Sequence, residues 1–319
     1  MSQSSNSPSN LPPNSSKPQG VTVWWLLALG IFGVSTSTLW IRLSDSDEVN
    51  LAFRRLLLAA PVLWWFAWKS GKQPSLRTAS RSVSIAGVCL AIHFGAWMAS
   101  LKFLSVATSV VLVYVHPVIV YSIEVMRRQA RADGLRLVGV VVTLYGTWIL
   151  TEAARDPGYG DQSLLGIALA LIGSVAFVGY IFAGRAATLK LSTAVYTSRA
   201  YSVAALVLAG YLVISGIRGG SPGLLPPENG DEWLLAAMLA LFPTLLGHTP
   251  LNAALRHLPP SVVSTAFLGE VAVAPMIVWI YPGLREVPPE AFWSGGPLVV
   301  LGILTVVWRG SRAPSTGLK

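Results

Sequence analysis

The sequence predicts an all-α membrane protein with ten transmembrane helices, arranged as two inverted five-helix repeats. Three observations support this fold class. The 319 residues are 53% hydrophobic and only 12% charged, whereas soluble domains carry about 25% charged residues. The hydrophobic residues gather into long runs, and a run of about 20 can cross a membrane as a helix. Short sequence matches also recur between the two halves of the chain in the same order.

The composition excludes several other classes of protein. The single cysteine, Cys89, lies in a hydrophobic run, so neither a disulfide framework nor a cysteine metal cluster is expected. The net charge is +9, but the basic residues are scattered over short loops, which argues against a nucleic-acid partner. Motifs of metalloproteases, serine hydrolases and P-loop proteins are absent from the sequence. We therefore expect no enzyme, no cofactor and no metal.

Hydrophobic runs define the predicted spans in chain order. Each run can cross a hydrocarbon core of about 30 Å at about 1.5 Å per residue. A helix satisfies every backbone amide within its own segment, as a lipid environment requires. The ten predicted spans are 22–43, 49–68, 82–101, 105–126, 135–152, 163–184, 192–215, 232–254, 260–281 and 289–308.

The loops predict how these spans are oriented. An even number of spans places both termini on one side of the membrane. The loops and tails on that side hold fifteen Lys and Arg residues, against five on the other side. Cytoplasmic loops carry an excess of basic residues. We therefore expect a multi-pass plasma-membrane protein with a disordered cytoplasmic tail at 1–20, rich in Ser, Asn and Pro, and a cytoplasmic tail at 309–319.

Two halves, 22–152 and 163–308, contain matching segments. Ala99–Leu104 recurs as Ala253–Leu258, 154 residues later. Glycine pairs seven residues apart occur in the last span of each half, namely Gly139 with Gly146 and Gly295 with Gly302. Because each half has five spans, the second half enters the membrane from the opposite side, and the repeat is inverted. Inverted repeats are typical of secondary transporters, although a scaffold could also retain such symmetry.

Several of these residues together resemble a known family. They are the motif A-[SA]-L-[KR]-x-L that closes spans three and eight, His116-Pro117, Glu270-Val271 with Pro275, and Arg-x4-Ala in spans two and seven. On these residues the chain resembles EamA-type members of the drug/metabolite transporter superfamily over 22–308. The resemblance implies a central cavity lined by spans one to four and six to nine. It also implies that spans five and ten lie at the periphery.

The same family often carries a Gly-Glu pair just before the fifth span of each half. In this sequence Glu286 follows Arg285 in the second half, and basic residues take the corresponding place in the first half. Sequence alone therefore does not predict gating glutamates at these positions. Glu124 has Arg127 and Arg128 one turn later and is expected to form a structural pair with them.

Glu270 is the most deeply placed charge, ten residues into predicted span nine. His116 is its repeat partner, midway along span four. A charge at a helix centre costs about 2.5–3.5 kcal/mol on insertion scales, so it usually faces a cavity or a partner. We expect the two residues to face one cavity, where they carry a proton or bind a substrate amine. The alternative is a hydrogen bond that fixes helix packing.

Arg54 and Arg199 lie in spans two and seven, at positions that the repeat relates. A guanidinium on each side of the membrane centre could bind a carboxylate or phosphate in turn. The alternative is that both side chains extend to the interface or pair with acids in the loops.

Four further polar and aromatic residues are candidates for the cavity wall. His93 and Trp97 are four residues apart and share a helix face, and His248 and Asn252 have the same spacing. Their alternative role is helix packing. Trp40 is a further cavity candidate, whereas most tryptophans lie at span ends as an interfacial belt. Prolines are expected to interrupt helices near the membrane centre at Pro117, Pro243, Pro250 and Pro275.

Together these features predict a secondary carrier that works by alternating access in the lipid bilayer. The resemblance implies a small polar metabolite such as an amino acid, moved outward, with proton coupling left open. Two alternatives remain, an uptake permease or exchanger for an anionic metabolite and a non-transporting scaffold or enzyme. The sequence does not determine the oligomeric state.

Overall fold

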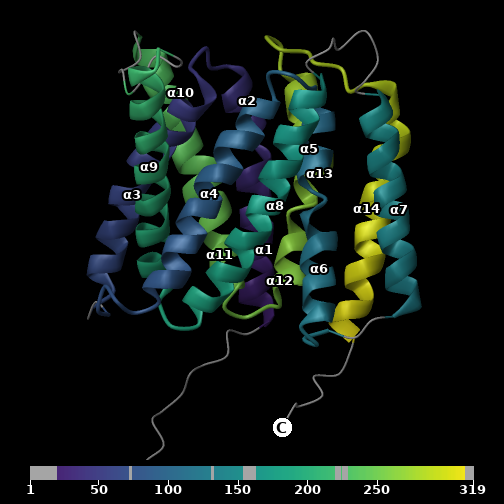
Figure 1. The fold of residues 1–319 in the computed structure, drawn as a ribbon, viewed down its shortest axis with the longest axis horizontal. Coiled ribbons are helices and arrows are strands. Elements are labelled where there is room, and N and C mark those ends of the chain that lie inside the picture. The colour runs from purple at the N-terminus through teal and green to yellow at the C-terminus, as the bar shows by residue number, and fades with distance from the viewer. Residues whose placement is uncertain are drawn as a thin grey trace, which may run out of the picture.

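The computed structural model describes residues 20–71, 74–130, 133–153, 163–219, 224 and 229–312. All regular structure in this part of the chain is helical. The helices form one upright bundle (Figure 1). In chain order they are α1 (Gly20–Ser35), α2 (Ser37–Arg42), α3 (Glu48–Lys69), α4 (Ser80–Ser100), α5 (Val106–Val113), α6 (His116–Met126), α7 (Gly134–Ala153), α8 (Ser163–Thr188), α9 (Thr193–Ile217), α10 (Gly230–Leu239), the π-helix η2 (Ala240–His248), α11 (Thr249–Ala254), α12 (Pro260–Ala266), α13 (Gly269–Ile280) and α14 (Glu290–Arg312).

Eight segments of the described chain are long and hydrophobic enough to cross a membrane. Their outer surface is hydrophobic, as expected of side chains that face lipid. Trp24, Trp25 and Trp68, for example, are each about 70% exposed. The chain is therefore a multi-pass membrane protein. The eight segments are Val23–Arg42, Glu48–Lys69, Ser80–Ser100, Val106–Met126, Ser163–Thr188, Thr193–Ile217, Gly230–Ala254 and Pro260–Ile280.

Predicted spans five and ten correspond to α7 and α14, which lie side by side at one edge of the bundle (Figure 1). Their contact is built on glycines. A methyl group on Gly146 would lie 2.7 Å from the carbonyl oxygen of Gly295, and one on Gly302 would lie 2.6 Å from that of Gly139. The two helices therefore pack backbone to backbone within the chain. Ten membrane crossings and the inverted repeat remain predictions.

Two spans are broken in the middle, where hydrogen-bonded helix gives way to a turn. The fourth span divides at Tyr114 and Val115, between α5 and α6. The ninth span divides at Phe267 and Leu268, between α12 and α13. Tyr114 and Phe267 are 153 residues apart, close to the offset of the sequence matches.

The prolines are not all at the breaks. Pro117 lies in the first turn of α6, just after the break, where a missing N–H is tolerated. Pro275, by contrast, lies inside α13, so the expectation that it interrupts the span is wrong. Pro243 lies within η2 and Pro250 in the first turn of α11. Neither proline divides its span, which continues from α10 through the wider π-helix η2 into α11. The π-helix accommodates the hydrogen bond that a proline cannot make.

The first span is divided at Thr36, between α1 and α2. The hydroxyl of Ser35 donates to the Ile31 carbonyl at 2.8 Å, and that of Thr36 donates to the Gly33 carbonyl at 2.9 Å. Such side-chain bonds to the preceding turn bend a helix. Beside the bend, a methyl group on Gly33 would lie 2.7 Å from the Cα of Gly247. Only glycine allows α1 and η2 to cross this closely.

Candidate functional site

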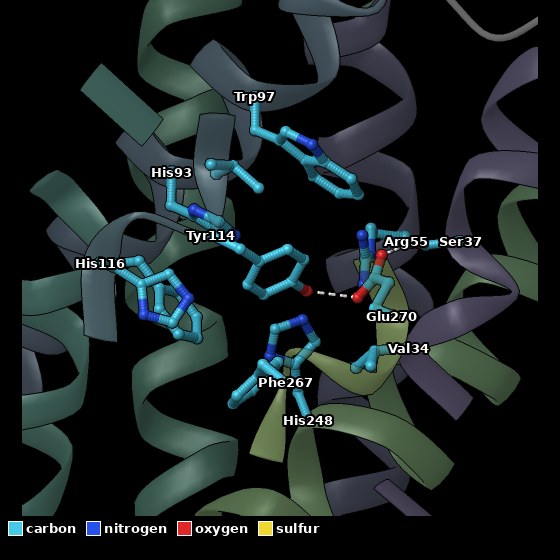
Figure 2. Close-up of a pocket in the computed structure, with 12 residues that line it drawn as sticks. Val34, Ser37, Arg55, His93, Trp97, Tyr114, His116, His248, Phe267 and Glu270 are labelled. Atoms are coloured by element: carbon cyan, nitrogen blue, oxygen red, sulfur yellow. Dashed lines mark hydrogen bonds between the residues drawn. The ribbon is translucent and has the colours of Figure 1, made fainter. Parts of the chain in front are cut away.

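The helix breaks surround a pocket in the middle of the bundle. In this closed form the pocket has room for little more than one water molecule. Figure 2 shows Glu270, Arg55 and Ser37 on one side, His93 and His116 on the other, and Tyr114 between them. The lining residues are Val34, Ser37, Arg55, His93, Trp97, Val113, Tyr114, His116, Phe177, His248, Phe267 and Glu270.

Glu270 is the carboxylate of the pocket and is 2% exposed. It is the second residue of α13, directly after the break in the ninth span. One carboxylate oxygen accepts from the Ser37 hydroxyl at 3.1 Å, and the other accepts from the Tyr114 hydroxyl. Three interrupted spans, the first, fourth and ninth, therefore meet at this one side chain. The two hydroxyls compensate for the loss of water around the carboxylate.

Arg55 is the cation of the pocket and is fully buried. It lies on α3, and its Nε donates to the Thr244 hydroxyl at 2.9 Å. The guanidinium carbon lies 4.0 Å from the centroid of the Phe94 ring. Among the described residues, Nη1 and Nη2 have no hydrogen-bond partner. A buried charge with unmade hydrogen bonds is costly.

Three histidines complete the polar wall. His93 Nδ1 donates to the Gly173 carbonyl at 2.9 Å, and its ring stacks on Trp97 with centroids 5.9 Å apart. His116 Nδ1 and the Ser264 hydroxyl are hydrogen-bonded at 2.7 Å. Three buried nitrogens of these histidines and of Trp97 have no hydrogen-bond partner among the described residues. They are Nε2 of His116, Nδ1 of His248 and Nε1 of Trp97.

Aromatic rings join these histidines into one cluster. The Phe177 ring lies 4.6 Å from His93 and 4.5 Å from His116, centroid to centroid. Phe267 lies 5.6 Å from His248 and 5.0 Å from Phe177. The pocket therefore combines one carboxylate and one guanidinium with a largely aromatic wall. This composition is typical of a ligand site.

Comparison with known proteins connects this geometry to a family. Residues 20–152 match the EamA-like transporter family. The resemblance inferred from the motifs is thus confirmed, and the chain is a membrane transporter by class.

Two further similarities extend beyond the EamA-like half. A protein of Archaeoglobus fulgidus, described as an uncharacterized transporter, is 24% identical over 287 residues, covering 87% of this chain and 94% of that protein. A protein of known crystal structure matches with a TM-score of 0.66 and 17% identity, over 92% of this chain and all of the other. At this identity the second similarity shows the fold alone.

The bundle brings five of the nine predicted site residues together. They are Glu270, His116, His93, Trp97 and His248. The four others lie elsewhere. Asn252 donates to the hydroxyls of Tyr180 and Tyr201, and Trp40 stacks on Phe242 with ring centroids 6.1 Å apart.

The two predicted anion contacts also lie outside the pocket, at opposite ends of the bundle. Arg54 donates to the Ser46 hydroxyl at 2.8 Å. Arg199 donates to the carbonyls of Pro74 and Ser75 at 2.7 and 3.3 Å. The cation in the pocket is instead Arg55, because a step of one residue on a helix turns the side chain by about 100°.

Sequence reasoning missed seven lining residues, namely Val34, Val113, Ser37, Arg55, Tyr114, Phe177 and Phe267. One signal was available for Arg55. It lies four residues after Leu51 and four before Ala59, both of which are buried hydrophobic residues on the same helix face. The hydroxyl and aromatic residues carried no such signal, since each is common in membrane helices.

An ion pair closes the upper end of the bundle, which holds the turns around residues 43–47, 101–105 and 281–289 (Figure 1). Arg42 Nε lies 3.0 Å from an oxygen of Glu286. Arg42 also donates to the carbonyls of Leu101 and Leu104 at 2.5 and 2.9 Å. Glu286 in turn accepts from the backbone N–H of Val106, the first residue of α5, at 2.6 Å.

A matching arrangement closes the lower end, which holds the turns around 127–130 and 255–259 (Figure 1). Arg185 donates to the carbonyl of Leu255. Glu124 accepts from the backbone N–H of Ser261, at the start of α12, at 3.2 Å. The charge of Arg185 is near enough to interact with that of Glu124.

These contacts correct the expectation that Glu124 pairs with Arg127 and Arg128. They also show that the two ends of the bundle are built alike. Glu124 contacts the opposite half, while Arg127 lies over the Phe182 ring at 5.0 Å. Leu101 and Leu255 occupy the same place in the repeated motif, 154 residues apart. Each end therefore joins an arginine to a carbonyl of the repeated motif, and a glutamate to the start of a helix in the other half.

At the lower end, burial and the charges of Arg256 and Arg185 lower the pKa of His257.

Proposed function

We propose that the chain is a secondary active transporter of a small polar metabolite, working by alternating access around the central pocket. The observation that carries this proposal is the pocket itself. It combines Glu270 and Arg55 at the meeting point of three interrupted spans. Substrate sites of secondary transporters are formed by such broken helices near the membrane centre.

The two closures support the alternating mechanism. When the Arg42–Glu286 contact separates, the upper end opens and α5 loses the acceptor at its first N–H. When the Glu124–Ser261 contact separates, the lower end opens in the same way. Each contact joins one half to the other. Rocking one half against the other therefore breaks one closure while it keeps the second intact.

Glu270 is the coupling residue in this mechanism. As a carboxylate it accepts from both Ser37 and Tyr114. When it is protonated, one oxygen becomes a donor and can no longer accept in the same way. Protonation therefore weakens the bonds that hold α2, the α5–α6 turn and α13 together. A proton at this site favours a different arrangement of the three spans.

The proposed orientation in the membrane rests on the charge of the loops. The proposed cargo and direction of transport rest on the family resemblance. We place the lower end and both termini in the cytoplasm, because that side holds the larger number of basic residues. The proposed cargo is an amino acid or a related metabolite, moved outward in exchange for protons. Uptake or exchange of an anion is the second candidate, and Nη1 and Nη2 of Arg55, which have no hydrogen-bond partner among the described residues, favour it.

Transport by purified protein in proteoliposomes tests this function. A pH gradient is imposed, and the vesicles contain a mixed pool of labelled amino acids and organic acids. We expect one class of compound to move with the gradient, and Glu270→Gln to lose that coupling. Exchange that ignores the gradient would support the anion exchanger. No movement of any compound, together with an intact fold, would support a scaffold.

A further inference from the structure

Arg55 is a fully buried cation that has no ion pair within 4 Å in the described structure, although the charge of Glu270 acts on it from a greater distance. Neither of the two ion pairs among the described residues includes it. The Phe94 ring covers one face of the guanidinium, with the ring centroid 4.0 Å from the guanidinium carbon. Nε donates to the Thr244 hydroxyl. The edge formed by Nη1 and Nη2 has no partner among the described residues. Arg55 is one of the residues that line the pocket.

The free edge has the geometry that binds a carboxylate. A guanidinium is planar, stays charged, and presents parallel N–H groups that match the two oxygens of a carboxylate. Trp97 Nε1 is a second buried donor without a partner in the described chain. Glu270 already accepts from two hydroxyls. His116 Nε2 and His248 Nδ1 also lack a partner, and each can donate or accept according to its tautomer. The nitrogens that can only donate, Nη1 and Nη2 of Arg55 and Nε1 of Trp97, outnumber these two, so the unused groups favour an anionic ligand.

The lining also favours a carboxylate over a phosphate. Arg55 is the only Arg or Lys among the residues that the structure places in the lining. A phosphate group carries a charge of about −1.5 to −2 at neutral pH, which one guanidinium does not balance. Val34, Val113, Phe177 and Phe267 form hydrophobic parts of the wall. They suit a hydrophobic body attached to the carboxylate.

We propose that Arg55 binds the carboxylate of the transported molecule, and that the substrates are small monocarboxylates with a hydrophobic body. This inference rests on the transport function proposed above and adds the substrate class. In the closed form the pocket has room for little more than a water molecule. The ligand therefore enters when the closure at one end opens, and the guanidinium gains its partner at that step.

Binding to the purified full-length protein in detergent tests the proposal without transport. The probes are L-leucine, L-phenylalanine, 4-methylpentanoate and 3-phenylpropionate, each compared with its amide, in which an uncharged carboxamide replaces the carboxylate. A ligand that binds the folded state raises the unfolding temperature. We expect at least one acid to raise it and the matching amide to leave it unchanged. Arg55→Lys and Arg55→Met should each weaken binding of that acid at least tenfold.

Arg54→Lys is the matched control, because Arg54 is on the same helix and contacts Ser46 outside the pocket. We expect it to bind the acid as the wild type does. A second measurement needs no ligand. Arg55→Met without ligand should unfold at the same temperature as the wild type or higher, because it removes an unpaired buried charge. A fall of several degrees would show that Arg55 stabilises the fold, and would overturn the proposal.

Three other results would also overturn it, namely equal binding of acid and amide, full binding by Arg55→Met, and no response to any acid. Failure of the transport function gives a different pattern. Acids that bind through Arg55 but do not move in proteoliposomes would remove the transport proposal and leave the site. Transport of the amides by Arg55→Met would remove the site and leave transport.

Discussion

A single carboxylate holds three interrupted spans together at the centre of the molecule. Glu270 is reached by a hydroxyl from α2 and a hydroxyl from the α5–α6 turn. Neither donor is close to it in the sequence, since Tyr114 is 156 residues away and Ser37 is 233 residues away. The protonation state of one side chain therefore affects contacts between both halves.

Glu270→Gln tests the proton role of this residue. Gln has the same shape and keeps one acceptor oxygen, but it does not titrate. We expect the variant to fold and to exchange substrate across the membrane, while accumulation driven by a pH gradient is lost. Initial rates in proteoliposomes with and without the gradient measure this. Asp45→Asn, at the upper end, is the control, and gradient-driven accumulation by Glu270→Gln would contradict the account.

Tyr114→Phe tests the cost of leaving the buried carboxylate with one donor fewer. The change removes only the hydroxyl that bonds to Glu270. An unsatisfied buried group costs about 1–3 kcal/mol, and more where it is charged. We therefore expect the free energy of unfolding to fall by about 1–3 kcal/mol or more. Tyr145→Phe, at an exposed position on α7, should change it by no more than about 0.5 kcal/mol.

At the scale of helices and turns, the start of two half-helices depends on glutamates from the opposite half. Glu286 contacts the first residue of α5, and Glu124 contacts the second residue of α12. Side-chain oxygens stabilise helix starts by accepting from free N–H groups. The two glutamates thus link the order of each broken span to closure at its own end.

Glu286→Gln should favour opening at the upper end. The Arg42 ion pair is partly exposed and contributes at most about 1 kcal/mol, and a charged hydrogen bond such as that to Val106 contributes about 1.5–3 kcal/mol. A loss of about 1.4 kcal/mol raises the open population tenfold. Alkylation of Val113→Cys, made with Cys89→Ser, by a reagent that does not cross membranes should therefore accelerate about tenfold from the upper side.

Glu124→Gln is the matched variant for the lower end. It should accelerate alkylation from the lower side and leave the upper side unchanged. Equal acceleration from both sides in either variant would mean that these contacts stabilise the bundle in general. The closures would then have no role in selecting a side.

Gly146→Ala should weaken the contact between α7 and α14. The added methyl group would lie 2.7 Å from the Gly295 carbonyl oxygen, which is backbone and cannot move alone. Overpacking of this kind costs about 1–3 kcal/mol. We expect a lower unfolding temperature with substrate binding retained. Gly210→Ala is the control, since a methyl group there meets nothing within 4 Å, and a fall in both variants would contradict this explanation.

For the whole molecule, the sequence predicted the helical membrane class, most of the spans and five of the pocket residues. Long hydrophobic runs and buried charges are strong signals, because lipid penalises exposed polar groups severely. His93, His116 and Glu270 could be identified for this reason. Each is an ionisable residue far from the end of its span.

Other residues depend on geometry that the sequence does not reveal. Arg54 and Arg55 are adjacent, and only the rotation of α3 decides which one faces the pocket. Pro117 lies beside a helix break, whereas Pro275 lies within an unbroken helix. Neighbouring groups can accommodate a proline in a membrane helix, so a proline in the sequence does not by itself locate a break. Ser37 and Tyr114 acquire a role only through a carboxylate that is remote in the chain.

Alternating access is the central claim, and a reversible lock at the upper end tests it most directly. Arg42→Cys and Glu286→Cys, made with Cys89→Ser, are joined by a short cleavable reagent that links two thiols. We expect the lock to stop transport and to block entry of small reagents to the pocket from the upper side only, and reduction of the linker to restore both. Transport that continues with the upper end locked would contradict the account.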